Sequence, residues 1–337
     1  MQPKRLLVTG GAGFIGSAFI RYALKNALKA EQVVNLDLLT YAADLKHLKE
    51  IENDRRYLFV QGDIRDGRLV EELLRKHAID TLVHFAAETH VDRSIEAPPL
   101  FYDTNIGGTI ALLEAVRRVQ GVRFHQISTD EVFGSLGWEG VFTERSPYAE
   151  RSPYAPNSPY AASKAGADHF VFAYARTYGL TPTLSYCSNN YGPCQNREKL
   201  IPKMIRCCLE EACIPLYGKG ENVRDWLFVE DHVHAVWLIL EKGVLGESYA
   251  IGGGEELSNL SLAHLVIREV ARQTGKSEAA LKRLVTFVED RPGHDLRYAV
   301  DPAKMKNKLG FTPRVFFDEG LQRTVFWYLN QFCYAQR

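Results

Sequence analysis

Short apolar runs alternate with longer amphipathic segments over the first 130 residues. The amphipathic segments predict helices near 15–28, 44–52, 67–77 and 103–119, and the apolar runs predict buried strands at 6–9, 33–37, 57–61, 81–86 and 124–128. Strands that are apolar throughout and alternate with helices are typical of a parallel sheet covered on both faces. The pattern therefore predicts an α/β fold with a doubly wound parallel sheet.

After residue 180 the pattern is less regular. It predicts a strand at 183–187, a loop at 189–197, a helix at 200–212, a strand near 227–229, and helices near 261–274 and 318–332 on either side of a strand at 285–288. This mixture indicates a smaller mixed α/β domain. We divide the chain into domains 1–182 and 183–337, with some later chain crossing back, and expect the ligand in a cleft between them.

Proline interrupts the pattern at two places. Pro98-Pro99 predicts a stop before the helix that follows Asp103. Segment 144–161 contains Ser-Pro-Tyr-Ala three times at a period of six residues. Because prolines at that spacing exclude a helix, we predict a loop with a local duplication at 144–155. An amphipathic helix is expected from about 161 to 178.

Composition and charge narrow the possible partners. Lys and Arg together number 41, as do Asp and Glu, so the formal net charge is zero. Without a basic excess, the chain is not expected to bind nucleic acid or a membrane surface. It shows neither a signal-peptide core nor an apolar stretch that suggests a membrane helix. The six cysteines fit no metal template, so we interpret them as reduced thiols of a cytoplasmic protein without a metal.

A glycine-rich turn carries the first chemical signal. Gly10, Gly13 and Gly16 follow the first predicted strand and open a helix. Glycine suits this place because the backbone must turn sharply and approach a pyrophosphate at the helix N-terminus. Asp37 ends the second strand, where a carboxylate binds a ribose 2′-hydroxyl and repels a 2′-phosphate, and no arginine follows it directly. These residues predict a Rossmann domain that binds NAD rather than NADP.

Two later strand ends favour the same cofactor. Asp63 and Ile64 end the third strand, where a carboxylate reaches the adenine amino group, although an ordinary turn aspartate is the alternative. Phe85, Ala86 and Ala87 end the fourth strand with small residues that let the cofactor pass close to the backbone.

Tyr160 and Lys164 form a Tyr-x-x-x-Lys pair, one helical turn apart on one face. A nearby ammonium and the positive end of nicotinamide lower the pKa of a phenol, so that its anion takes a proton from a hydroxyl. Tyr148 and Tyr154 are near-copies, but serines stand four residues after them. Tyr160 is therefore the candidate base.

Asp130 and Glu131 follow Ser128-Thr129 at the end of the fifth predicted strand. Two adjacent carboxylates that face a nicotinamide cleft are candidates for an acid/base pair, and a helix N-cap with a first-turn acid is the alternative. Alcohol oxidation alone does not need them. Removal of water does, because it takes a base for a C–H and an acid for the departing hydroxyl.

Together these motifs resemble the extended short-chain dehydrogenase/reductase family and, more closely, its nucleotide-sugar 4,6-dehydratases. The similarity covers nearly the whole chain and extends to segments 90–94, 189–193, 198–202, 217–220, 224–226 and 290–295. The Asp130-Glu131 pair discriminates best, because the similar 4-epimerases lack it and UDP-glucuronate decarboxylases have the glutamate without the aspartate.

The resemblance implies a role for each catalytic residue. Tyr160 removes the proton of the sugar 4-hydroxyl while hydride passes from C4 to NAD⁺, and Lys164 lowers the tyrosine pKa and holds the nicotinamide ribose. Glu131 takes the C5 proton, Asp130 protonates the leaving 6-hydroxyl, and Thr129 hydrogen-bonds a sugar hydroxyl. Hydride then returns to C6, which gives a 4-keto-6-deoxy sugar and regenerates a tightly bound NAD.

The resemblance also implies the binding residues. The cofactor is expected to contact Gly10, Gly13, Phe14, Ile15, Gly16, Asp37, Asp63, Ile64, Phe85, Ala86, Ala87, Thr104, Tyr160, Lys164 and Asn190. The nucleotide sugar is expected to contact Thr89, Thr129, Asn189, Lys199, Leu200, Pro215, Tyr217, Arg224, Asn259, Arg291 and His294. Guanidinium groups suit a diphosphate, although a single arginine here also suits a surface ion pair. Helices 103–119 and 161–178 resemble those that pair in homodimers of the family.

The sequence departs from the family pattern at Phe133, where a tyrosine is usual, at Cys194 and Arg197, and in the duplicated segment 144–155. These changes bear on substrate and rate rather than on reaction type. The expected substrate is glucose linked to a thymine nucleotide. Two alternatives stay open: a 4,6-dehydratase of UDP-glucose or a UDP-N-acetylhexosamine, and a non-catalytic NAD-binding regulator.

Overall fold

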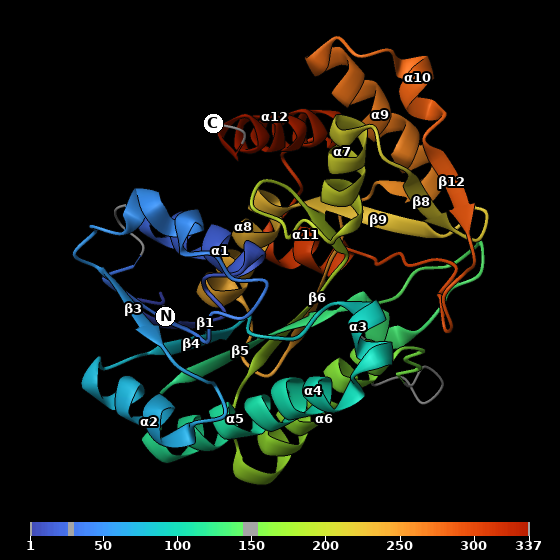
Figure 1. The fold of residues 1–337 in the computed structure, drawn as a ribbon. Coiled ribbons are helices and arrows are strands. Elements are labelled where there is room, and N and C mark those ends of the chain that lie inside the picture. Colours follow the sequence, from blue (N-terminus) through green and yellow to red (C-terminus); the bar gives the residue numbers. More distant parts are fainter. Residues whose placement is uncertain (1, 26–29, 144–153, 336–337) are drawn as a thin grey trace.

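The structure, a computed structural model, describes residues 2–25, 30–143 and 154–335, with side chains through residue 331 (Figure 1). The predicted duplicated loop at 144–155 lies outside the described residues except for its last two positions. Tyr148 and the side chain of Cys333 lie outside them as well.

A seven-stranded parallel sheet forms the centre of the molecule, in the strand order β10-β6-β5-β4-β1-β2-β3 (Figure 1). Its strands are β1 (Arg5–Thr9), β2 (Gln32–Asp37), β3 (Tyr57–Gln61), β4 (Thr81–His84), β5 (Arg123–Thr129), β6 (Thr183–Cys187) and β10 (Ser248–Ile251). The order reverses between β1 and β4, and ligands of doubly wound sheets bind at the carboxyl ends of strands at such a reversal. The predicted fold class is confirmed.

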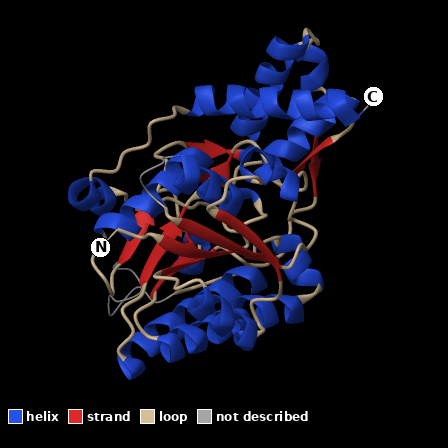
Figure 2. Ribbon diagram, turned by 90° about the vertical axis from the view of Figure 1, so that its left-hand side faces the viewer, coloured by secondary structure: helices blue, strands red, loops and turns tan. Residues whose placement is uncertain are grey.

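Helices cover both faces of this sheet (Figure 2). The helices on one face contact one another and are α1 (Phe14–Lys25), η1 (Leu45–Ile51), α8 (Val229–Lys242) and α11 (Ala303–Leu309). The other set is α2 (Gly67–Lys76), α3 (Val91–Glu96), α4 (Pro98–Phe101), the π-helical turn η2 (Tyr102–Gly107), α5 (Gly108–Val119) and α6 (Pro159–Tyr178). Successive residues of β1 serve opposite faces, since Leu6 and Val8 pack in one core cluster and Leu7 in the other.

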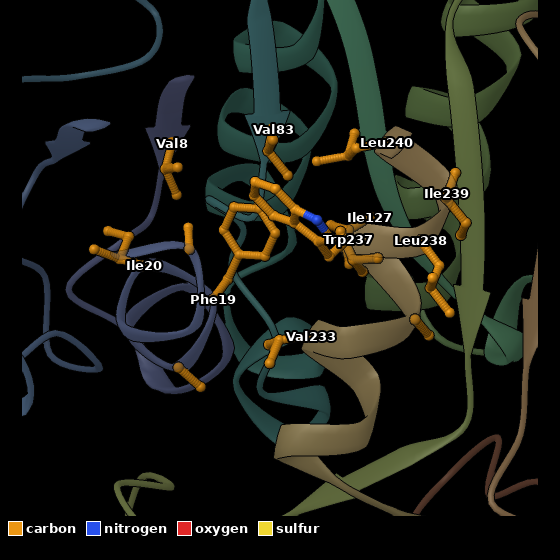
Figure 3. Packing of buried hydrophobic residues seen from close by; sticks show 14 of the residues in the cluster. Val8, Phe19, Ile20, Val83, Ile127, Val233, Trp237, Leu238, Ile239 and Leu240 are labelled. Carbon is orange, nitrogen blue, oxygen red and sulfur yellow. The ribbon is translucent and has the colours of Figure 1, made fainter. Parts of the chain in front are cut away.

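The core between α1 and α8 is built around two aromatic rings. Phe19 of α1 and Trp237 of α8 have centroids 6.2 Å apart and are almost fully buried, next to Val8 and Val83 of the sheet (Figure 3). Burying an aromatic or aliphatic side chain of this size stabilises a fold by roughly 1.5–3 kcal/mol. This packing fixes α1, and with it the glycine turn that precedes it.

The remaining elements form the smaller part of the molecule. A three-stranded sheet has the order β11-β9-β7, and a two-stranded parallel sheet pairs β12 with β8. The elements are β7 (Asn189–Tyr191), β8 (Ile214–Tyr217), β9 (Val223–Phe228), β11 (Glu256–Ser258), β12 (Val285–Val288), α7 (Leu200–Glu210), α9 (Asn259–Thr274), α10 (Glu278–Lys282) and α12 (Phe317–Ala335). The boundary at residues 182 and 183 stays a prediction, and both β6 and β10 lie in the large sheet.

Four local predictions differ from the structure in bounds or in type of element. The segment predicted as a helix at 44–52 is a 3₁₀ helix, and the predicted loop at 189–197 begins with the strand β7. Pro98 and Pro99 start α4 instead of preceding a stop, because the first turn of a helix needs no N–H donor there. The predicted strand near 227–229 is confirmed as the end of β9, which starts earlier, at Val223, and ends at Phe228, one residue before α8 begins.

Helix α8 was missed altogether for a physical reason. Nearly every residue from Val229 to Leu240 is buried, polar residues included. A helix that is buried all round has no polar face, so it lacks the alternation by which an amphipathic helix is found.

Candidate active site

A groove follows the carboxyl edge of the large sheet, past the ends of β1, β2, β4, β5 and β6. Every residue predicted to bind the cofactor lines this groove. All the predicted catalytic residues line it as well: Thr129, Asp130, Glu131, Tyr160 and Lys164. Four of the predicted sugar-binding residues do so too, namely Thr89, Asn189, Lys199 and again Thr129. The fold therefore brings together positions that are far apart in the sequence.

The glycine turn between β1 and α1 fits the backbone of a dinucleotide. Gly10 has a φ of +69°, and a Cβ on it would lie 2.6 Å from the backbone of Ala86. A Cβ on Gly16 would lie 2.2 Å from the carbonyl oxygen of Gly10. A larger residue at either position would distort the turn. The N–H groups that open α1 face a site for a phosphate at its N-terminus, as NAD binding requires.

The carboxylate at the end of β2 is fixed under this turn. Asp37 accepts hydrogen bonds from the backbone N–H groups of Ala12 and Leu39, both at 2.8 Å. Burial raises the pKa of Asp37, and the two backbone donors oppose that rise. The geometry fits a carboxylate that accepts from a ribose hydroxyl.

The structure shows Asp63 in a turn at the edge of the groove, and its contact with adenine stays a prediction. It lines the groove, and it also accepts a hydrogen bond from the backbone of Arg65 and forms an ion pair with the Arg65 guanidinium at 2.6 Å. The Arg65 side chain lowers the pKa of Asp63.

The end of β5 and the start of α6 carry the catalytic candidates. Thr129 caps the short helix η3 (Asp130–Phe133), accepting from the N–H of Glu131 at 3.3 Å. This cap puts Asp130 and Glu131 in the first turn. Ser158 caps α6 in the same way, accepting from the N–H of Ala161 at 3.1 Å. Tyr160 and Lys164 follow in the first two turns of α6, and both are buried.

The two carboxyl groups of the pair have different electrostatic surroundings. Burial raises the pKa of Asp130 well above its usual range, and the neighbouring Glu131 raises it further. Burial also raises the pKa of Glu131, but Arg224, Arg291 and Lys199 oppose that rise. Asp130 is therefore the better proton donor and Glu131 the better proton acceptor, which is the division of labour that elimination of water needs.

The phenol and the ammonium of α6 are both buried. Burial is the largest cause of the raised pKa of Tyr160, Glu131 and Cys187 add to it, and a hydrogen bond with Thr129 opposes it. Lys164 donates from Nζ to the carbonyl oxygen of Ile127 at 2.7 Å, and burial lowers its pKa. A phenol in this place gives up its proton when positive charge stands beside it, which is the role predicted for Lys164 and nicotinamide.

Two of the other predicted substrate residues, Arg224 and Arg291, put positive charge near Glu131. Arg224 is buried on β9 and donates to the carbonyl oxygen of Asp295 at 3.0 Å. Arg291 contacts Asp92 at 3.3 Å, and the hydroxyl of Tyr217 donates to the same carboxylate at 3.1 Å.

The remaining predicted substrate residues are His294, Leu200, Pro215 and Asn259. His294 has its ring 5.8 Å from that of Tyr217 and pairs with Asp290 at 2.6 Å, while burial lowers its pKa. Within the described residues, Leu200 begins α7, Pro215 lies in β8 and Asn259 begins α9. None of these three lines the groove, and neither do Tyr217, Arg224, Arg291 and His294.

Sequence reasoning missed several residues of the groove. Glu88 is buried, and its Oε2 has no hydrogen-bond partner among the described residues, while Cys187 lies at the end of β6. Both come at or just after the end of a strand that the pattern did predict. The rule that found Asp37 and Asp130 would therefore have found them too.

Two of the residues that depart from the family pattern, Phe133 and Cys194, are buried. The ring of Phe133 packs against Tyr186 and Tyr154, with centroids 4.7 and 5.6 Å apart. Cys194 adopts a φ of +71°. Arg197 is exposed.

Comparison with known proteins decides the family. A family model described as GDP-mannose 4,6 dehydratase matches residues 7–324. The chain belongs to this family. The predicted resemblance to nucleotide-sugar 4,6-dehydratases is therefore confirmed, as is the Rossmann-type sheet that carries the site.

Three similar proteins carry the name dTDP-glucose 4,6-dehydratase. The dTDP-glucose 4,6-dehydratase of Neisseria meningitidis serogroup B is 47% identical over 97% of this chain and 94% of its own length. That of Escherichia coli is 44% identical over 99% of this chain and 96% of its own length. The dTDP-glucose 4,6-dehydratase DesIV of Streptomyces venezuelae, crystallised with NAD bound, superposes with a TM-score of 0.90 at 46% identity and 98% coverage of both chains.

Among the residues that the structure describes, no helix is both long and apolar enough to cross a membrane.

Proposed function

We propose that this chain converts dTDP-glucose to dTDP-4-keto-6-deoxyglucose and water, with a tightly bound NAD that each turnover regenerates. One observation carries the proposal: the buried Asp130 and the half-buried Glu131 line the same groove as the Tyr160-Lys164 pair. The first pair suits elimination of water and the second suits oxidation of an alcohol. The names of the similar proteins support the substrate.

The first step is oxidation at C4 of the sugar. When bound, NAD would supply the acceptor for the C4 hydrogen with its electron pair and the donor of that hydrogen to C6. Tyr160, as the phenolate, accepts the proton of the 4-hydroxyl, and Lys164 stabilises that anion with its positive charge. Thr129, at the end of β5, hydrogen-bonds the same hydroxyl.

The second step removes water from C5 and C6. The ketone at C4 makes the C5 hydrogen acidic, and the Glu131 carboxylate takes it as a proton. Asp130 gives its own proton to the 6-hydroxyl, which leaves as water, so a double bond forms between C5 and C6. The 4-keto-6-deoxy sugar would be complete once the bound cofactor had supplied hydride to C6 and a proton had returned to C5. The raised pKa of Asp130 supports its role as the acid.

The diphosphate and the base are assigned to residues that lie beyond the groove lining, past Glu131. We assign the diphosphate to Arg224 and Arg291, because guanidinium groups bind phosphate oxygens in pairs. The assignment is supported by their action on the Glu131 carboxylate, which puts positive charge close to the reacting sugar. Thr89, Asn189 and Lys199 complete the sugar pocket, and Leu200, Pro215, Tyr217, Asn259 and His294 are assigned to the outer nucleotide.

We expect the working form to be a cytoplasmic homodimer. Large apolar side chains are exposed along α4, η2 and α6, including Leu100, Tyr102 and Phe170 at 46, 56 and 40% of their surface. A second copy of the chain would cover them. Reduced thiols, as interpreted for the cysteines, suit the cytoplasm.

Incubation of the purified protein with dTDP-glucose, without added NAD, tests the proposal. We expect mass spectrometry to show conversion to a species lighter by one water, because the cofactor is retained and recycled. UDP-glucose and UDP-N-acetylglucosamine are the comparison substrates. Turnover of a UDP-sugar alone would contradict the proposed substrate, and no turnover of any of them with NAD present would contradict the reaction.

A further inference from the structure

Asp168 is a fully buried carboxylate for which the proposed reaction has no use. It lies on α6 one turn after Lys164, and none of its surface is exposed. An aspartate in this position has no solvent to stabilise its charge, so its presence calls for a partner.

The hydrogen bonds of Asp168 join the elements that carry the catalytic residues. Ser128, the neighbour of Thr129 on β5, donates its hydroxyl to Oδ2 of Asp168 at 2.5 Å. The hydroxyl of Tyr154 donates to the same oxygen at 3.2 Å and lies 2.7 Å from the hydroxyl of Tyr186 on β6. Asp168 therefore connects α6 to Ser128 of β5, a residue that lines the groove.

Among the residues that the structure describes, Lys164 forms no salt bridge within 4.0 Å, and Asp168 is the carboxylate that raises its pKa. The Nζ of Lys164 donates to the carbonyl oxygen of Ile127, which carries only a partial negative charge. A buried ammonium stays protonated only when a negative group compensates the loss of water. The charge on Lys164 matters because Tyr160, one turn earlier, has Glu131 and Asp130 near it, and both disfavour its ionised form.

Lys164 and Asp168 also interact with His84, Cys187 and Tyr154, and each of these three groups is neutral. Burial lowers the pKa of His84 on β4 well below its usual value, so its imidazole is uncharged. Burial raises the pKa of the Cys187 thiol on β6 to about 12 and that of the Tyr154 phenol far above its usual value. Asp168 differs, because burial raises its pKa only to about 6 while Lys164 opposes the rise. At neutral pH Asp168 is thus ionised, whereas His84, Cys187 and Tyr154 are not.

We propose that Asp168 is a positioning residue that acts through Lys164: its carboxylate supplies the negative charge that keeps the Lys164 ammonium protonated beside Tyr160. This inference rests on the proposed function for the role of Tyr160. The interaction of Asp168 with Lys164 does not depend on the proposed function, so either hypothesis can fail without the other.

A double-mutant cycle on the NAD-saturated protein tests the charge pair without any turnover. Asp168→Asn and Lys164→Met each leave one buried charge unpaired, and the double variant removes both. We expect each single variant to lower the Tm, and the double variant to melt at or above the less stable single variant. Losses of Tm that simply add would overturn the proposal.

The pH profile of turnover tests the consequence for the reaction. Without Asp168 the Lys164 ammonium loses its proton at lower pH, so the alkaline limb of kcat for Asp168→Asn should move down by about one pH unit or more. Asp168→Glu, which restores the charge, should move the limb back. Ser128→Ala removes a hydrogen bond and keeps the charge, so its limb should stay in place.

The outcomes separate the two hypotheses. A lower rate at every pH with the alkaline limb unmoved would reduce Asp168 to a purely structural residue and overturn the proposal. If the wild-type protein turned over none of the sugar nucleotides, the proposed function would fail. The melting cycle would then still decide whether Asp168 and Lys164 form a pair.

Discussion

Tyr160→Phe is expected to stop the reaction at its first step, with the rate of C4 oxidation lowered by about 10²–10⁴-fold. The variant keeps the ring, which packs edge-on to Phe101 with centroids 6.5 Å apart, and loses only the hydroxyl. Without a phenolate, nothing accepts the proton of the sugar 4-hydroxyl as hydride leaves C4. Rapid mixing with dTDP-glucose should therefore produce no NADH absorbance.

Tyr174→Phe is the matched control for this variant. Tyr174 lies on the same helix, and its hydroxyl donates to Glu114 at 2.8 Å, away from the groove. We expect it to form NADH as fast as the wild type does. Oxidation at the normal rate by Tyr160→Phe would show that another group is the base.

Asp130→Asn should separate the two halves of the reaction. The amide has the shape of the carboxyl group but no acidic proton, so C4 oxidation proceeds while loss of water slows by about 10²–10⁴-fold. Bound NADH should accumulate in the first turnover, because hydride has no C6 acceptor until water has left. Absorbance follows the NADH, and mass spectrometry follows the dehydrated product.

Asp66→Asn provides the control for an aspartate-to-asparagine change. Asp66 caps α2 by accepting from the N–H groups of Arg68 and Leu69, and it is exposed. Asparagine caps a helix about as well as aspartate, so this variant should keep both rates. If Asp130→Asn dehydrated the sugar at the wild-type rate, the acid would have to be sought elsewhere in the groove.

Local signals were enough to predict much of the site. The glycine turn, Asp37 and the Tyr160-Lys164 pair each occupy a short segment whose spacing reflects one element, so their positions follow once β1, β2 and α6 are identified. The end of β5 was equally predictable, because a buried strand followed directly by Asp130 puts that residue at the carboxyl edge of the sheet.

Contacts between distant segments were not predictable in this way. Lys199, Arg224 and Arg291 surround Glu131 only because α7, β9 and the segment after β12 fold against the edge of the large sheet. No spacing in the sequence encodes that arrangement, and the resemblance supplied it. Asp168 was missed for the same reason, since a single aspartate on an amphipathic helix gives no sign that Ser128 will lie 2.5 Å away.

The central claim is that one sugar is both oxidised and reduced on a cofactor that does not leave. The most direct measurement uses dTDP-glucose that carries deuterium at C4, incubated with the protein without added NAD. We predict a product that has lost one water and carries the deuterium on C6. Deuterium found in solvent, retained at C4 or released on free NADH would contradict this account.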